Sequence, residues 1–230
     1  MAILAGTMWT VLPARAGDPG KIDGFVTPYY NSAGPMVHAG RYSAGLASTN
    51  ESQLVATIRQ MRKRWNQLNF VELYVGAIRL YDVGYRNEST YWFYTAQYRG
   101  RLFAALIDQK KMGTIGSPGF EYYHAEDAFS QVAGPNVNGY AFGNIDFLMK
   151  VIRQVQNENR SAPNMPAIYP GVSFIGESQW DAKNRELNSG LSKFSLLIVN
   201  QKAQIASQRS QNGTQARFSH LTSKPFPGGF

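Results

Sequence analysis

The sequence predicts an α+β domain, in which an antiparallel or mixed sheet in the N-terminal half is followed by a helical part. Two observations predict this order. Between residues 70 and 107 the chain carries short tyrosine-rich segments in which apolar and polar residues nearly alternate, as in half-buried strands. After residue 125 the apolar residues recur instead with helical spacing.

Length and composition predict one large domain. The chain has 230 residues, of which 43% are hydrophobic and 17% charged, so a sizeable core can form. We expect a signal-like or disordered leader at residues 1–16, a single α+β domain at 17–210 and a loose tail at 211–230. Ala14-Arg15-Ala16 resembles a signal-peptidase cleavage site, and with several N-x-S/T sequons it favours secretion.

The charge balance predicts a polyanionic partner. The net charge is +8 and the pI about 9.7, which places nucleic acid or an anionic membrane surface first. A basic surface without a function is the alternative. The absence of cysteine and the wide spacing of the three histidines predict that no metal is bound. No apolar run approaches the ~20 residues of a membrane span.

The first predicted element is a helix from Glu51 to Asn66 with Asn50 as its N-cap. Basic residues crowd its polar positions. They form either a solvated face or a surface that follows phosphates. These basic residues are Arg59, Arg62, Lys63 and Arg64.

The remaining elements follow from alternation, helical periodicity and breakers. A short helix over 125–132 is expected to end at Gly134-Pro135, and Asn144 is expected to cap a helix from Ile145 to Gln156. The predicted strands are 70–78, 80–85, 91–98, 101–107, 194–200 and 203–206.

No motif for phosphate-loop, dinucleotide, serine-hydrolase or zinc-protease chemistry occurs in the sequence. The basic surface and the 13% aromatic content remain. Together they favour capture of a nucleic acid or a base by charge and stacking. A carbohydrate-binding or structural protein tolerates the same composition.

The stretch RLYDVGYRNESTYWFY, from Arg79 to Tyr94, resembles the central hairpin of the ribosome-inactivating proteins, the family of the ricin A chain and the Shiga toxin A subunits. In that family a tyrosine of this hairpin stacks on the target adenine, and the matching residue here is Tyr81. The resemblance covers roughly residues 51–209.

Two later segments are similar to that family in the same order. Residues 128–147 look like the segment that follows its second stacking tyrosine, which points after a small shift to Tyr123 or Tyr122. Glu177-Ser178-Gln179-Trp180 resembles a stretch whose tryptophan lines the catalytic cleft, which points to Trp180.

The resemblance implies an rRNA N-glycosylase that removes one adenine from large-subunit rRNA and so inhibits translation. It implies the ribosome as partner, a monomer, and no metal or cofactor. The chemistry needs a carboxylate and a cation. The family's Glu-x-x-Arg motif is absent from the chain, and Glu158 and Arg160 are the nearest acid and base.

Two alternatives remain open from the sequence. One is a non-catalytic relative that binds RNA or a base. The other is a secreted, aromatic-rich module that binds carbohydrate or protein through Tyr and Trp. In either alternative the tyrosines can serve as cross-strand packing and Trp180 as a core residue.

Overall fold

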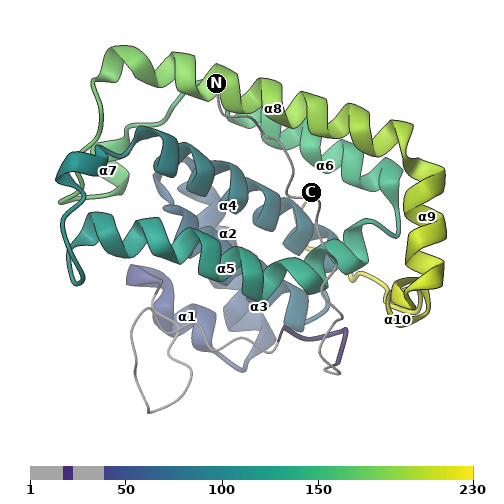
Figure 1. Ribbon diagram of the computed structural model, residues 1–230. Coiled ribbons are helices and arrows are strands. Elements are labelled where there is room, and N and C mark those ends of the chain that lie inside the picture. Colours follow the sequence, from purple (N-terminus) through teal and green to yellow (C-terminus); the bar gives the residue numbers. More distant parts are fainter. Residues whose placement is uncertain (1–17, 23–38, 230) are drawn as a thin grey trace.

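The computed structural model describes residues 18–22 and 39–229, and in these ranges the fold is helical (Figure 1). The predicted α+β class is therefore wrong. Within the described residues, β pairing is limited to one isolated bridge between Ile107 and Phe174. The longer helices are α2 (Glu51–Lys63), α3 (Phe70–Asp82), α4 (Arg86–Leu106), α5 (Pro118–Ala141), α6 (Ile145–Glu158), α8 (Trp180–Asn200) and α9 (Lys202–Gln211).

Shorter helical pieces connect the long helices or flank them. They are η1 (Gly40–Tyr42), α1 (Ser43–Ala47), η2 (Trp65–Gln67), η3 (Gln109–Lys111), α7 (Met165–Ile168), η4 (Glu177–Gln179) and α10 (Thr214–Phe218).

The region predicted as a four-strand meander is a hairpin of two helices, α3 and α4. Helix α3 begins at a capping box, in which the Asn69 side chain accepts from the Glu72 N–H and the Glu72 carboxylate accepts from the Asn69 N–H. Such a box satisfies two backbone donors at once. The fully buried aliphatic and tyrosine side chains of α3 then recur three or four residues apart, at Leu73, Tyr74, Ala77, Leu80 and Tyr81.

Helix α4 occupies the centre of the molecule and packs against α3, α5, α6 and α8 (Figure 1). Residues 88–100 are buried without interruption, so this stretch of α4 has no face in contact with water. The sequence of a helix that is surrounded by other helices has no apolar stripe and is rich in aromatic residues throughout. Periodicity alone cannot distinguish such a sequence from that of a buried strand. The high β-propensity of its Tyr, Trp, Phe and Thr residues is overridden by tertiary packing.

The hairpin is closed by two glycines. Gly84 ends the turn between the helices with φ = 92°, a left-handed conformation that favours glycine. Gly76 in α3 lies under the Trp92 ring, where an added Cβ would stand 2.7 Å from the ring carbons. Glycine at this position therefore permits the close approach of α3 to α4.

Helices α5, α6 and α8 cover α4 on its other sides (Figure 1). The predicted stop at Gly134-Pro135 is wrong, since α5 continues through Pro135 to Ala141. Pro135 is exposed, whereas Ala133, Val137 and Ala141 are buried on the inner side. Packing of that inner face offsets the backbone hydrogen bond that proline cannot donate.

The two late strands are also absent. Residues 194–200 form the last turns of α8, and residues 203–206 belong to α9. The apolar segment Phe194 to Val199, which the sequence predicts as a strand, has one buried and one exposed side. Ile198 is 3% exposed, whereas Leu196 is 64% exposed. Two helices that the sequence predicts are confirmed: α2 with Asn50 as N-cap and α6 with Asn144 as N-cap.

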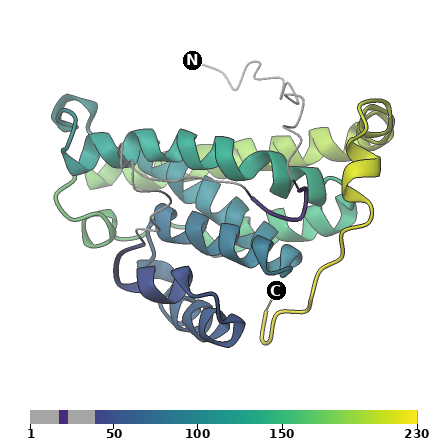
Figure 2. The same cartoon turned by 90° about the horizontal axis from the view of Figure 1, so that it is seen from below.

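The segment after α9, predicted as a loose tail, contains α10 and then runs along the molecule to the α3–α4 hairpin, as Figure 2 shows. Phe226 is buried, and its ring lies edge-on to that of Tyr85 at 5.2 Å. Lys224 donates its backbone N–H to Gly84 and pairs with Glu51 at 3.0 Å. The predicted leader at residues 1–16 lies outside the described residues.

Candidate functional site

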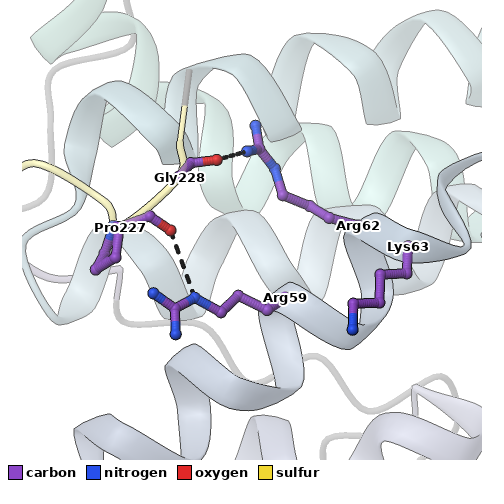
Figure 3. Close-up of a pocket in the computed structure, with 5 residues that line it drawn as sticks. All are labelled: Arg59, Arg62, Lys63, Pro227 and Gly228. Carbon is purple, nitrogen blue, oxygen red and sulfur yellow. Dashed lines mark hydrogen bonds between the residues drawn. The ribbon is translucent and has the colours of Figure 1, made fainter.

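Four basic side chains project from the C-terminal half of α2 and the residue after it. Three of them line an open hollow of about 470 Å³, whose other wall is formed by Pro227 and Gly228 (Figure 3). We call this set the α2 basic surface; it consists of Arg59, Arg62, Lys63 and Arg64.

The groups that meet these cations across the hollow are neutral. The Arg59 guanidinium donates to the Pro227 carbonyl at 3.5 Å, and Arg62 donates to the Gly228 carbonyl (Figure 3). Lys63 and Arg64 are exposed. Among the described residues, none of Arg59, Lys63 and Arg64 has an ion pair with a carboxylate. Within the part of the chain that the structure describes, three of the four cations therefore carry positive charge that no ion pair compensates.

Arg62 differs from its neighbours because its guanidinium also contacts a carboxylate in the interior of the protein. Its guanidinium pairs with the Glu88 carboxylate at 3.0 Å, and Glu88 is only 2% exposed. The Trp92 indole N–H donates to Glu88 at 2.7 Å. Arg62 therefore pairs with a buried carboxylate, and removal of one partner of such a pair destabilises a fold.

A group of aromatic side chains lies beside the basic surface. Together with one carboxylate that two of them bind, we call this group the Trp65 cluster; it consists of Trp65, Tyr91, Trp92 and Glu158. Trp65 stacks on Tyr91 at 5.3 Å and meets the edge of Trp92 at 4.9 Å. The Trp65 indole N–H donates to Glu158 at 3.0 Å, and the Tyr91 hydroxyl donates to the same oxygen. Burial, followed by this bond, raises the pKa of Tyr91 above its ordinary value.

The Trp65 side chain is half-buried, and two residues lie against its ring. Tyr91 covers one part of it, and the Arg99 guanidinium lies over the ring at 5.3 Å from the centroid. Arg99 is itself 4% exposed and donates to the Trp65 and Leu68 carbonyls at 2.6 and 3.3 Å. The indole is thus a structural bridge, and the neighbouring cations are the accessible part of this region.

The predicted acid and base do not form a pair. The Glu158 carboxylate accepts from Trp65, from Tyr91 and, at its other oxygen, from Gln154 at 2.6 Å. Arg160 is exposed and donates to the Asn157 side chain at 2.8 Å. Glu158 therefore joins α6 to α4 and η2, while Arg160 makes only a local contact.

The three predicted aromatic site residues have separate surroundings. Tyr81 is fully buried in α3, and its hydroxyl donates to the Pro19 and Asn136 carbonyls at 2.8 and 3.2 Å. Tyr123 is half-buried on α5, with its ring edge-on to His124 at 5.5 Å. Trp180 begins α8, is 8% exposed and donates to the Ile175 carbonyl at 2.9 Å.

Most of the tyrosines belong to the core. Several of their hydroxyls find partners inside the fold, as the bond from Tyr98 to Asn184 at 2.8 Å illustrates, whereas the Tyr74 hydroxyl is buried with no hydrogen-bond partner among the described residues. The buried tyrosines are Tyr42, Tyr74, Tyr81, Tyr85, Tyr91, Tyr94, Tyr98 and Tyr169. Most of the tyrosine content therefore supplies packing.

Sequence reasoning identified the cations of α2, and it named Glu158 as an acid without its contact to Trp65. It missed Glu88, the carboxylate that pairs with Arg62. Glu88 lies inside a segment interpreted as a turn, and only the packing of α2 against α4 brings it to Arg62. A signal for the helical hairpin was present in Asn69-x-x-Glu72, which is the spacing of a capping box.

Two features of the described residues bear on the possible chemistry. In this part of the chain, no cluster of three or more metal-ligating side chains is present. None of its helices combines the length and apolar character needed to cross a bilayer. Comparison of the chain with protein-family models, curated proteins and solved structures found no significant match.

Proposed function

We propose that the protein binds the phosphate backbone of single-stranded RNA through the α2 basic surface. One observation carries the proposal: Arg59, Lys63 and Arg64 are exposed beside an open hollow and have no carboxylate partner among the described residues. Contact of such cations with phosphates releases condensed counterions, which drives binding without sequence recognition.

The helical geometry suits a linear polyanion. Arg59 and Lys63 are four residues apart in α2, so they share one face and are separated by about 6 Å along the helix axis. Arg62 lies beside them and lines the same hollow. Arg62 is already paired with the Glu88 carboxylate. We therefore expect the other three cations to contribute most of the attraction for phosphates.

Backbone contact fits better than base recognition. Stacking of a base needs a free aromatic face, and the Trp65 ring next to the surface is covered by Tyr91 and Arg99. We therefore expect affinities for different RNA sequences to be similar.

The N-glycosylase activity that the resemblance implies stays a prediction. It requires a carboxylate free to act at a sugar and a cation close to the base. Glu158 is engaged by three donors, and Arg160 contacts Asn157. These contacts support a binding role ahead of depurination.

Fluorescence anisotropy with a labelled oligo-uridine tests the proposal. The triple variant Arg59→Ala/Lys63→Ala/Arg64→Ala removes the uncompensated cations and leaves the buried Arg62–Glu88 pair intact. We expect its affinity at moderate salt to fall by about tenfold or more.

The matched control removes the same net charge from another face. Lys150→Ala/Arg153→Ala/Lys193→Ala changes three exposed side chains of α6 and α8, and it is expected to bind RNA as the wild type does. Equal losses in both triple variants would reduce the effect to net charge, and the proposed site would then be rejected.

A further inference from the structure

The C-terminal half of α8 exposes three large aliphatic side chains within four residues. Leu196 is 64% exposed, and Leu197 and Val199 are each 51% exposed. We call these three residues the α8 apolar patch. The opposite side of the helix is buried through Trp180, Asn184 and Ile198. One face of α8 therefore packs on the core, and the α8 apolar patch is exposed to water.

Helix α6 runs antiparallel to α8 at the side of the patch (Figure 1). The Gln156 amide donates to Ser192 at 2.8 Å, and Lys202, just beyond α8, pairs with Asp146 at 3.1 Å. These two contacts fix the register of the helices. They place the α6 residues between 146 and 156 alongside the last turns of α8.

Cations surround the patch on both helices. Lys150 and Arg153 are exposed on α6, and Lys193 is exposed on α8, one turn before Leu196. No Asp or Glu occurs in the sequence from residue 187 to residue 229. The nearby acid of α6, Asp146, is neutralised by Lys202. Lys150, Arg153 and Lys193 have no ion pair with any carboxylate of the described ranges. The face formed by α6 and α8 thus combines aliphatic side chains with positive charge.

We propose that this face docks on an anionic lipid surface. Aliphatic side chains at the interface of a bilayer, flanked by Lys and Arg near acidic headgroups, are the combination that binds membranes peripherally. The patch lies on an outer helix of the molecule (Figure 1), where a flat surface can reach it. This proposal uses residues apart from the α2 basic surface and does not depend on the proposed RNA binding.

A second copy of the chain fits this face less well. In a symmetric contact centred on the patch, Lys150, Arg153 and Lys193 of one molecule would approach those of the other. Like charges brought together across an interface oppose association. Charge complementarity therefore selects an anionic surface over self-association.

Vesicle co-sedimentation of the full chain tests the proposal. Vesicles of phosphatidylcholine with phosphatidylserine are compared with vesicles of phosphatidylcholine alone. We expect binding to the anionic vesicles only, with loss at high salt. Leu196→Ser/Leu197→Ser/Val199→Ser is expected to weaken binding at least tenfold. Because these side chains are exposed, the variant is expected to fold, which circular dichroism checks.

The charge variants separate the two surfaces. Lys150→Ala/Arg153→Ala/Lys193→Ala is expected to weaken vesicle binding at least tenfold, whereas Arg59→Ala/Lys63→Ala/Arg64→Ala is expected to bind vesicles as the wild type does. Equal loss in both variants would overturn the assignment to this face.

A site-specific label tests whether the patch itself enters the lipid. The chain has no cysteine, so Leu196→Cys gives a single attachment point for an environment-sensitive dye. Its emission is expected to shift to the blue with anionic vesicles. The same dye at Gln131→Cys, on an exposed position of α5, is expected to show no shift.

The proposal is overturned by folded wild-type protein that ignores anionic vesicles, or by an unchanged emission from the dye at position 196. Sedimentation equilibrium supplies the remaining outcome. A concentration-dependent dimer that the triple serine variant abolishes would show that a second copy covers the patch, and the lipid proposal would be rejected.

Discussion

The Trp65 indole donates a hydrogen bond of 3.0 Å to the Glu158 carboxylate, across 93 residues of sequence. The Tyr91 hydroxyl donates to the same oxygen. One carboxylate at the end of α6 thereby joins η2 and α4, directly beside the α2 basic surface. The residue that the sequence predicts as a catalytic acid is a connection between helices in the structure.

Removal of this acceptor is expected to destabilise the fold. In Glu158→Ala the part-buried hydrogen bond from the Tyr91 hydroxyl and the bond from the Trp65 N–H are both lost, at a cost of about 1–2 kcal/mol in the free energy of unfolding. Glu158→Gln retains an acceptor oxygen and should lose less. Urea denaturation measures both, with Glu186→Ala at an exposed position of α8 as the control. A loss in Glu158→Ala no larger than that of the control would contradict the bridging role.

Two glycine substitutions test the helical hairpin. In Gly76→Ala the added Cβ would stand 2.7 Å from the Trp92 ring, and such overpacking costs about 1–3 kcal/mol. In Gly134→Ala, within α5, the nearest atoms are 3.6 and 3.8 Å away. Because the ring of Pro135 crowds the Cβ of the residue before it, we expect no net gain from this alanine, but a smaller loss than in Gly76→Ala. Thermal unfolding that ranks the two variants in the reverse order would argue against the packing of α3 on α4.

Glu126 is expected to make stability depend on pH. Burial raises the pKa of this carboxyl from 4.5 to about 7, with Arg101 opposing the rise and Asp127 adding to it. The folded state then holds a proton that the unfolded chain releases. The free energy of unfolding therefore falls as pH rises from 4.5 to about 7 and levels off above that.

Glu126→Gln carries the uncharged form at every pH, so its contribution to this decline should vanish. We expect the variant to gain on the order of 2 kcal/mol over the wild type between pH 5 and pH 8. Thermal melts at both values measure the gain, and Glu177→Gln, at an exposed position, serves as the control. An equal pH dependence in Glu126→Gln and wild type would refute the raised pKa.

Adenine release from ribosomes should remain at the background level. The Glu158 carboxylate is held by Trp65, Tyr91 and Gln154, and no other acid takes its place beside Arg160 in the described contacts. Free adenine is quantified after incubation of intact ribosomes with excess protein. Release by the wild type that is lost in folded Glu158→Gln would establish the N-glycosylase instead.

The sequence predicted α2 and α6, two helices in which one face meets water and the other packs on the core. In α2 and α6 the caps Asn50 and Asn144 precede an apolar stripe with a polar opposite side, and both features are local. The same reasoning failed for α4, because burial on all sides removes the stripe that distinguishes a helix from a strand.

In the candidate site, too, local features could be predicted from the sequence and long-range contacts could not. The cations of α2 were visible because they crowd one short helix. The partners of Arg62 and Trp65 were not, since Glu88 and Glu158 arrive from α4 and α6 only after those helices pack. Tyr81 illustrates the converse: its hairpin motif suggested a stacking platform, and helix packing makes it a fully buried core residue.

The salt dependence of RNA affinity tests the central proposal most directly. The slope of log K against log salt is measured for oligo-uridine with the wild type and with Arg59→Ala/Lys63→Ala/Arg64→Ala. If these three cations contact phosphates, the slope of the variant should be smaller in magnitude by about 2, since each contact with a single strand contributes about 0.7. An identical slope in the two proteins would show that the α2 basic surface does not bind RNA.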